Sequence, residues 1–374
     1  MMIDRRILKG FDWSFLGAVI VLSLIGVMTI YSATRPLLET QQSSFYVRQL
    51  NWIMLSLVIF FLAVSFDYMW FIRSAYLLYV IGVLLLIIVL VAGRKGMGAQ
   101  RWIDLGFLSF QPSEFFKIFI VMTLSRYLSQ MRNGVGLGLK ELSKMLGVFF
   151  ILPAVLILKQ PDLGTMLMVM FIFTSMILTY GIRKKILMTI IVIGLIALPF
   201  AGKIFWGGLK GYQKNRIIAF IDPQADPQGI GYHIAQSKVS IGAGGFLGKG
   251  YTKGTQGPYR FLPEHHTDFI FSIFSEEWGF MGSLLLFVLY LFIIWKGFDT
   301  AKNARDMEGT YLALGVTYMF TFYFIVNIGM TLGLMPVVGI PLPLMSYGGT
   351  ALLSNFIALS IIQNVRVRRF ASYY

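Results

Sequence analysis

Long apolar runs, separated by short polar connections, are the feature that most limits what this chain can fold into. Of its 374 residues, 57% are hydrophobic and only 13% are charged, whereas soluble domains carry roughly 25% charged residues. A spanning helix needs ~20 mainly apolar residues, because only a helix or a closed barrel satisfies every backbone polar group inside lipid. The runs are continuous instead of alternating, so we expect helices and not a β-barrel.

These runs predict an all-α polytopic membrane protein with about ten transmembrane helices, forming one domain over residues 1–374. The expected spans are 13–31, 48–66, 70–92, 112–131, 145–159, 163–181, 185–202, 267–295, 309–334 and 349–365. The first run follows three basic residues and could be a signal peptide. We expect a retained helix instead, because the run is long, Tyr31 to Ala33 make a poor cleavage site, and many spans follow.

Lys and Arg are unevenly distributed among the predicted connections. Ten spans put both termini on one side, where the connections carry more than twice as many basic residues as the short connections opposite. In membrane proteins, Lys and Arg concentrate in the connections on the cytoplasmic side, so we expect both termini to be cytoplasmic. The segment 203–266, between predicted helices 7 and 8, then forms a long extracytoplasmic loop. The net charge of +15 is dispersed over these connections, which argues against nucleic-acid binding.

The loop 203–266 is the one soluble-like region of the chain, and it is rich in Gly, Pro and polar residues. Loops of this length are usually functional or disordered. Ile234 and Ile241 flank Gln236, Ser237 and Lys238, as in a helix lying on a membrane surface. We therefore expect order here, and we treat these three polar residues as candidate substrate contacts.

Several common chemistries are excluded by residue types that are missing. The chain has no cysteine and three histidines, which excludes disulfides and thiolate sites and leaves little for zinc. The Gly-rich stretch 242–250 invites comparison with a nucleotide-binding phosphate loop. It has Ala243 and Gly250, however, where a Walker loop needs Gly and then Ser or Thr. A flexible turn is the favoured interpretation.

Charged residues near the start of the fourth span form the first candidate site. Pro112 and Ser113 suit a helix start, and Glu114 and Lys117 share one helix face. Charges entering an apolar helix are expensive and tend to mark a site, although a structural ion pair at the membrane edge is the alternative. With Arg101, which precedes the span, Lys117 could hold a pyrophosphate.

Two aspartates stand where outer connections enter helices. Asp162 begins the sixth span, where helix capping alone could explain it. It also belongs to the same outer face as Arg101 and Lys117, where it could orient a basic group. Asp268 begins the eighth span, where partial desolvation raises a carboxyl pKa toward values useful to a general base. A helix cap by Thr267 or Asp268 is the alternative.

The connection before the last span is apolar yet crowded with Pro and Gly between Gly333 and Thr350. Irregular apolar backbone at membrane depth persists only against protein or a cavity. We expect a re-entrant loop that closes one wall of an outward-facing groove and includes Ser346 as a candidate substrate contact. An inert tight connection is the alternative.

Taken together and in order, these motifs resemble the SEDS family of shape, elongation, division and sporulation proteins, over nearly the whole chain. The residues that carry the resemblance are RWIDLG (101–106) with QPSE (111–114), QPDLGT (160–165), HTDFIF (266–271), and PLP (341–343) with SYGG (346–349). EEWGF (276–280) and PLPL (341–344) are more similar to the RodA-like elongation branch than to the division branch.

The resemblance implies a ten-helix peptidoglycan glycosyltransferase that uses lipid II at the outer face of the cytoplasmic membrane. It also implies a class B penicillin-binding protein transpeptidase and elongation-complex proteins as partners, and it makes Asp268 the essential aspartate. A divalent cation, Mg2+ or Mn2+, is the one cofactor expected, and the sequence leaves its participation and ligands open. Two other functions remain open: a lipid II flippase, which needs a polar path reaching inward, and a non-catalytic scaffold for a transpeptidase.

Overall fold

The computed structural model describes residues 10–38, 45–96, 99–104, 106, 109–131, 136–208, 211–226, 229–255 and 267–369, and most of them are helical. The helices up to residue 180 are α2 (Trp13–Leu38), α3 (Phe45–Ser65), α4 (Tyr68–Arg73), α5 (Ala75–Ala92), α6 (Pro112–Ser129), α7 (Leu139–Met145), the π-helix η1 (Leu146–Ile151), α8 (Leu152–Lys159) and α9 (Leu163–Tyr180). After them come α10 (Lys184–Gly208), α11 (Gly211–Ile221), the 3-10 helix η2 (Pro223–Ala225), α12 (Ile230–Ala243), α13 (Ile270–Lys302), α14 (Met307–Thr331) and α15 (Gly349–Val367).

Each predicted span corresponds to helix, and eight helices in the described part of the chain are long and apolar enough to cross a membrane. The two predicted spans outside this group are α6 and α10. In α6, the charged Glu114, Lys117 and Arg126 lower the mean hydropathy, and most of the helix is buried inside the protein. Helix α10 lies at the edge, and its apolar side chains are largely exposed between residues 188 and 196.

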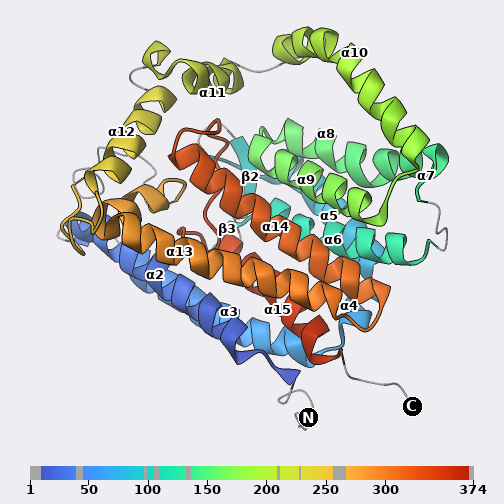
Figure 1. Cartoon of the computed structure of the whole chain (residues 1–374), viewed down its shortest axis with the longest axis horizontal. Coiled ribbons are helices and arrows are strands. Elements are labelled where there is room, and N and C mark those ends of the chain that lie inside the picture. Colours follow the sequence, from blue (N-terminus) through green and yellow to red (C-terminus); the bar gives the residue numbers. More distant parts are fainter. Residues whose placement is uncertain are drawn as a thin grey trace.

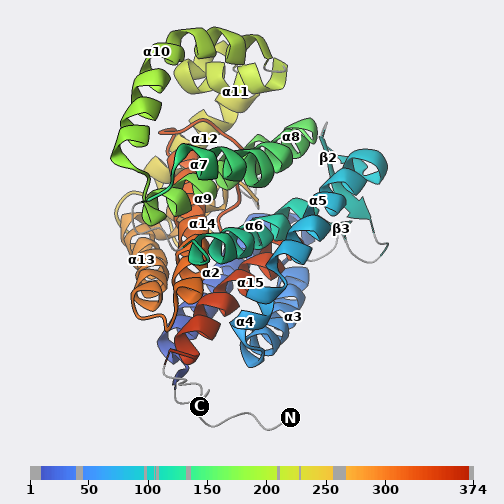
Figure 2. The ribbon, with the colours of Figure 1, turned by 90° about the vertical axis from the view of Figure 1, so that its right-hand side faces the viewer.

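The loop predicted for 203–266 differs from expectation in two ways. Helix α10 continues to Gly208, because the apolar residues Ile204 to Trp206 extend the helical run beyond residue 202. The described remainder is also mainly helical, with α11 and then α12 over the predicted helical segment. Residues 256–266, which end the predicted loop, lie outside the described residues. In Figures 1 and 2, α10 and α11 stand above the helical body.

A small sheet is an exception to the predicted all-α architecture. Between α5 and α6, the strands β1 (Arg94–Gly96), β2 (Ala99–Asp104) and β3 (Ser109–Phe110) pair antiparallel in the order β1-β2-β3. The outer strands are short, and Arg94 and Asp104 form an exposed salt bridge of 3.0 Å. The sheet fixes β2, which carries Arg101, beside the start of α6.

Helices α6, α14 and α15 form the interior of the bundle (Figure 1). Helix α6 packs against α5, α9 and α14, and α15 packs mainly against α3. Figure 2 shows α3, α5 and α8 on the side opposite to α13. Because these inner helices are enclosed by protein, they can carry polar groups that a lipid-facing helix could not.

An ion-pair cluster joins the helix ends on the side where the bundle starts and finishes. The Asp12 carboxylate lies 2.8 Å from Lys296 Nζ of α13 and 2.9 Å from Arg366 Nε of α15. Burial raises the pKa of Asp12, but the hydrogen bonds from Lys296, Ser14 and the Phe15 N–H and the charge of Arg366 outweigh it, lowering the pKa from 3.8 to about 2. The start of α2 and the end of α15 therefore lie together.

Helix α13 is interrupted at Gly279, whose backbone (φ 63°, ψ −159°) is not helical. The Gly-rich stretch 242–250 packs against this break: Lys249 N–H donates to Glu276 O (3.0 Å), and Phe280 N–H donates to Gly245 O (2.9 Å). The stretch is a turn, as predicted, but it is bonded to the helix break. These bonds satisfy backbone groups that the interrupted helix leaves without helical partners.

Candidate active site

A polar cavity of about 710 Å³ lies where β2, α6, α9, α11, the start of α13 and the connection before α15 meet. The charged residues that line it are Arg101, Glu114, Lys117, Asp162, Arg216 and Asp268. Five of these six were predicted from sequence. They are separated by up to 167 positions along the chain, so only the packing of the helices brings them together.

Asp268 lines this cavity immediately before α13. The helix begins at Ile270, and its N-cap position is Phe269, whose side chain makes no capping hydrogen bond. Neither Thr267 nor Asp268, the two predicted caps, therefore occupies the N-cap position. Instead, Asn327 of α14 donates from Nδ2 to the Asp268 carbonyl (3.0 Å) and to the Ile340 carbonyl (2.8 Å). This amide fixes the backbone that carries Asp268 against the opposite wall.

Glu114 and Lys117 lie one turn apart in α6 and form a buried ion pair of 2.7 Å. Glu114 Oε2 also accepts hydrogen bonds from Tyr323 of α14 (3.2 Å) and Ser354 of α15 (3.2 Å). Lys117 Nζ contacts the Tyr323 hydroxyl and lies 4.7 Å from the centre of its ring. The structural ion pair considered as an alternative is thus present, and it also lines the cavity.

Arg101 and Asp162 connect the sheet to the start of α9. Arg101 donates to the carbonyl oxygens of Gln160 (3.4 Å) and Pro161, and its Nη1 lies 3.8 Å from Asp162 Oδ1. Asp162 also caps α9, accepting from Thr165 N–H (3.2 Å) and Thr165 Oγ1 (2.9 Å). Capping was one of the two predicted roles of Asp162, and the carboxylate serves it while lining the cavity.

The irregular segment between α14 and α15 supplies one wall of the cavity through Gly339, Ile340, Pro341, Tyr347 and Gly348. Ser346 does not line the cavity. Its hydroxyl donates to the Thr267 carbonyl (2.6 Å) and accepts from Leu342 N–H (2.8 Å). Ser346 therefore closes the turn of the segment and attaches it to the residue that precedes Asp268.

The three candidates on α12 lie away from this cavity. Ser237 is fully buried, shares a 2.6 Å hydrogen bond with Ser272 and donates to the Thr331 carbonyl (2.6 Å). Lys238 is exposed beside Gly333, and Gln236 is half-buried. The expected helix is present, and it packs Ser237 against α13 and the end of α14.

Arg216 and Tyr323 line the cavity but were not among the predicted site residues. Arg216 was counted only as one basic residue of the long loop, and Tyr323 lies in the aromatic run Phe320 to Phe324, where nothing local distinguishes it. The sequence does contain a signal for Arg216. Gln213, Lys214 and Arg216 form a short polar group that is followed directly by apolar residues.

No group of three His, Asp or Glu side chains in the described ranges is close enough to hold a metal ion. Glu114, Asp162 and Asp268 line one cavity, but each of the first two is engaged with a cation or a helix N-terminus. These three carboxylates alone therefore do not form a complete protein-built metal site.

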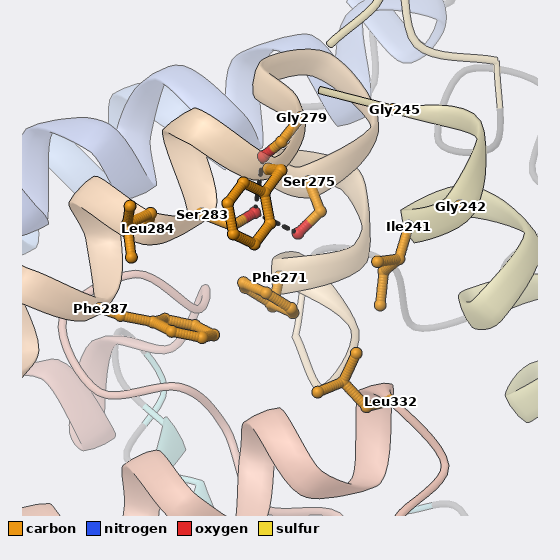
Figure 3. A pocket seen from close by; sticks show the side chains of 11 residues that line it. Ile241, Gly242, Gly245, Phe271, Ser275, Gly279, Ser283, Leu284, Phe287 and Leu332 are labelled. Atoms are coloured by element: carbon orange, nitrogen blue, oxygen red, sulfur yellow. Dashed lines mark hydrogen bonds between the residues drawn. The ribbon is translucent and has the colours of Figure 1, made fainter. Parts of the chain in front are cut away.

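A second cavity, of about 370 Å³, lies beside the break in α13 (Figure 3). Phe271, Leu284, Phe287 and Leu332 point into it. Its polar side chains are Ser275 and Ser283, and these bond to each other (3.0 Å). None of its lining residues is ionisable, so this cavity offers no acid, base or anion-binding group, and the polar cavity is the better candidate for chemistry.

Comparison with protein families gives a match to the model described as "Cell cycle protein" and labelled FtsW, RodA and SpoVE, over residues 12–370. The chain is 40% identical over 293 residues to peptidoglycan glycosyltransferase MrdB of Escherichia coli K12, covering 78% of this chain and 77% of that protein. It is 32% identical to peptidoglycan glycosyltransferase RodA of Treponema pallidum, covering 97% and 99% of the two chains.

Solved structures are similar over almost the full length. A chain in a peptidoglycan synthase complex, studied for the coordination of polymerization and crosslinking, matches with a TM-score of 0.83 at 30% identity, covering 97% of this chain and 99% of that one. The rod shape determining protein RodA of Thermus thermophilus matches with a TM-score of 0.70 at 27% identity, covering 97% and 98%.

Proposed function

The chain belongs to the family of FtsW, RodA and SpoVE cell cycle proteins, and we propose that it polymerises peptidoglycan glycan strands from lipid II during cell elongation and rod-shape maintenance. It is a multi-pass membrane protein and a peptidoglycan glycosyltransferase, the activity for which its curated relatives MrdB and RodA are named. The observation that carries the proposed mechanism is the position of Asp268, which lines a polar cavity beside Arg101 and Lys117.

The reaction needs one general base. Lipid II carries its sugar through an α-linked pyrophosphate, and a β-1,4 bond forms when a sugar hydroxyl attacks that anomeric carbon with inversion. Asp268 takes the hydroxyl proton as the new carbon–oxygen bond forms. Asp268 lines the cavity, and its Oδ2 lies 3.4 Å from the position of a Cβ built on Gly339 in the cavity wall.

The leaving group needs positive charge more than it needs an acid. The bond between the anomeric carbon and the pyrophosphate oxygen breaks, and its electron pair stays on undecaprenyl pyrophosphate. Cationic donors at Arg101 and Lys117 stabilise that charge as it develops. The Glu114–Tyr323–Ser354 contacts hold Lys117 in place. In glycoside hydrolysis, by contrast, a second carboxyl normally protonates the leaving group.

A divalent cation, Mg2+ or Mn2+, is proposed as an accessory to substrate binding. Mg2+ is commonly held by one or two carboxylates together with substrate phosphate oxygens, so Asp162 and the pyrophosphate would hold it jointly. Such an ion would supply additional positive charge to the leaving group. Chelation followed by re-addition of Mg2+ or Mn2+ to the polymerisation assay measures this requirement.

The proposed partner is a class B penicillin-binding protein transpeptidase, within a complex of elongation proteins. The similarity to a chain of a peptidoglycan synthase complex supports a partner that crosslinks the new strand. The proposed location is the cytoplasmic membrane, with the cavity facing outward. The uneven distribution of basic residues among the connections supports this orientation.

The decisive test gives purified protein fluorescent lipid II, with and without the partner, and compares Asp268→Asn with the native chain. We expect long glycan strands from the native protein and a rate lower by about 10²- to 10⁴-fold in the variant, because a general base contributes that much. Asp104→Asn is the matched control, since Asp104 is exposed on β2 outside the cavity.

Equal product from Asp268→Asn and native protein would refute the assigned base. A native protein that moves lipid II between leaflets of vesicles without making glycan would favour the flippase instead. The control variant should polymerise like the native chain, so loss of activity in both variants would indicate a general folding effect.

A further inference from the structure

Arg216 reaches the polar cavity from an element outside the bundle. It lies in α11, whose main contacts are with α12 and η2, and α11 stands above the helical body in Figure 1. The guanidinium nevertheless lines the same cavity as Asp268, Arg101 and Lys117. A long cationic side chain directed from a peripheral helix into a polar cavity is a candidate ligand-binding group.

Gly339 locates Arg216 relative to Asp268. A Cβ built on Gly339 would lie 3.4 Å from Asp268 Oδ2 and 3.8 Å from Arg216 Nη1. Both groups therefore lie over the same backbone position, and Gly339 has a φ of +73°, which favours glycine. The guanidinium of Arg216 and the carboxylate of the proposed base therefore lie near the same position of the cavity wall.

The balance of charges among the residues that line the cavity supports a binding role for Arg216. Without it, the lining residues contain two cations and three carboxylates, a formal excess of negative charge. The ammonium of Lys117 is paired with Glu114, and the guanidinium of Arg101 lies near Asp162. A pyrophosphate diester would then enter a site of like charge, which disfavours binding. Arg216 brings the formal charge of the lining to neutrality.

We propose that Arg216 is a substrate-binding residue that grips the departing pyrophosphate of the lipid-linked donor; this rests on the polymerase function proposed above. An Arg fork binds phosphate oxygens through two parallel hydrogen bonds. Arg216 and Asp268 line the same cavity and both lie near Gly339, so a donor bound beside Asp268 would have its pyrophosphate within reach of the guanidinium.

The step is balanced without a further reactant. The acceptor hydroxyl oxygen bonds to the anomeric carbon, and its proton passes to Asp268. The bond from that carbon to the pyrophosphate oxygen breaks, and the electron pair remains on the pyrophosphate. The guanidinium keeps its protons and stabilises the added charge by hydrogen bonding, so the contribution of Arg216 is greatest as the bond breaks.

The experiment compares Arg216→Gln, Arg216→Lys and the control Lys214→Gln in the full-length protein with its partner. Lys214 lies two residues away on α11 and does not line the cavity, so its substitution removes the same charge from the same helix. We expect Arg216→Gln to lose about 10- to 100-fold in kcat/KM, the value of hydrogen bonds to a charged group. Arg216→Lys should be intermediate, and Lys214→Gln should match the native enzyme.

Inorganic pyrophosphate is the binding probe, because a merely structural role would not change its affinity. Arg216→Gln should raise the pyrophosphate inhibition constant by about tenfold or more and reduce the increase in Tm that pyrophosphate gives the native protein. Inorganic monophosphate, tested in parallel, should inhibit more weakly than pyrophosphate. If Arg216→Gln does not fold in detergent, the inhibition constant of Arg216→Lys decides the question.

Three results would overturn the proposal. The first is a native kcat/KM in Arg216→Gln; the second is a reduced rate with an unchanged pyrophosphate inhibition constant. A defect that excess Mg2+ removes completely would likewise overturn it, since charge alone would then suffice. Absence of glycan synthesis by the native protein would instead contradict the polymerase function, so the two failures can be told apart.

Discussion

Several charged side chains that line the cavity have both a structural and a chemical role. Glu114 has a partner for each carboxylate oxygen, and Asp162 caps a helix while facing Arg101. A buried carboxylate is stable only when it is paired and hydrogen-bonded. These networks therefore fix the orientation of the Lys117 ammonium and the Arg101 guanidinium before substrate binds, which lowers the cost of reorganisation during the reaction.

Tyr323 is the residue on which this network depends most directly. Tyr323→Phe removes the hydroxyl that contacts Lys117 and bonds to Glu114 while keeping the ring. We expect a loss of about tenfold in kcat/KM, because one hydrogen bond to a charged group is removed. Glycan synthesis at limiting lipid II measures it.

The matched control is Tyr318→Phe on the same helix. Its hydroxyl bonds to Thr179 (2.6 Å) outside the cavity, so its kcat/KM should stay near the native value. Native kinetics in Tyr323→Phe would mean that Lys117 needs no support from this hydroxyl.

At the scale of elements, the break in α13 decides how the start of that helix meets the cavity. The helix is 33 residues long, well beyond the ~20 that cross a bilayer, and the break at Gly279 redirects its first part. The turn 242–250 fills the break with backbone hydrogen bonds, while Lys249 pairs with Glu276 at 2.6 Å. The turn, α12 and the start of α13 thus form one unit beside Asp268.

Gly279→Ala tests that unit. Its Cβ would lie 2.3 Å from Gly248 N, and the φ of +63° strains any other residue. We expect a loss of about 2–4 kcal/mol of stability, measured as a lower Tm in detergent, together with reduced glycan synthesis.

Gly17→Ala in α2 serves as the comparison, because nothing lies within 4 Å of the added methyl group. Replacing a helical glycine with alanine at an open site stabilises by about 0.4–1 kcal/mol. An unchanged Tm in Gly279→Ala would show that the turn 242–250 can shift to accommodate the methyl group. The break in α13 would then not depend on glycine.

At the scale of the whole molecule, the bundle has two distinct ends. The Asp12 cluster gathers the start of α2 and the ends of α13 and α15, whereas α11 and α12 lie at the opposite end (Figures 1 and 2). The polar cavity is lined by Arg216 of α11 and so belongs to that end as well. A lipid-linked substrate could therefore reach the cavity from the membrane while its sugar and pyrophosphate occupy the polar side.

Because the chain has no cysteine, the proposed orientation, with the cavity facing outward, can be tested directly by cysteine labelling. Single-cysteine variants at Gln224, exposed in η2, and at Lys302, exposed at the end of α13, report on the two ends. We expect a membrane-impermeant maleimide to label Gln224→Cys in intact spheroplasts and Lys302→Cys only after permeabilisation. The cysteine-free native chain is the blank, and the reverse labelling pattern would invert the proposed topology.

The sequence by itself determined the helical spans. Backbone inside lipid must satisfy its own hydrogen bonds, and within a single continuous apolar run only a helix does so. It also determined that Asp268, Asp162 and Glu114 lie close to helix starts, since such starts depend on neighbouring residues. Those features were predictable because their causes lie within a few residues.

Only the tertiary structure decided which polar residues share a cavity. Long-range packing turned Arg216 and Tyr323 toward Asp268 and Lys117, and it buried Ser237 and Ser346 in contacts that hold neighbouring segments. Hydropathy and spacing cannot distinguish these outcomes, because they describe a residue's surroundings along the chain, whereas the cavity depends on side chains that approach from helices far apart in sequence.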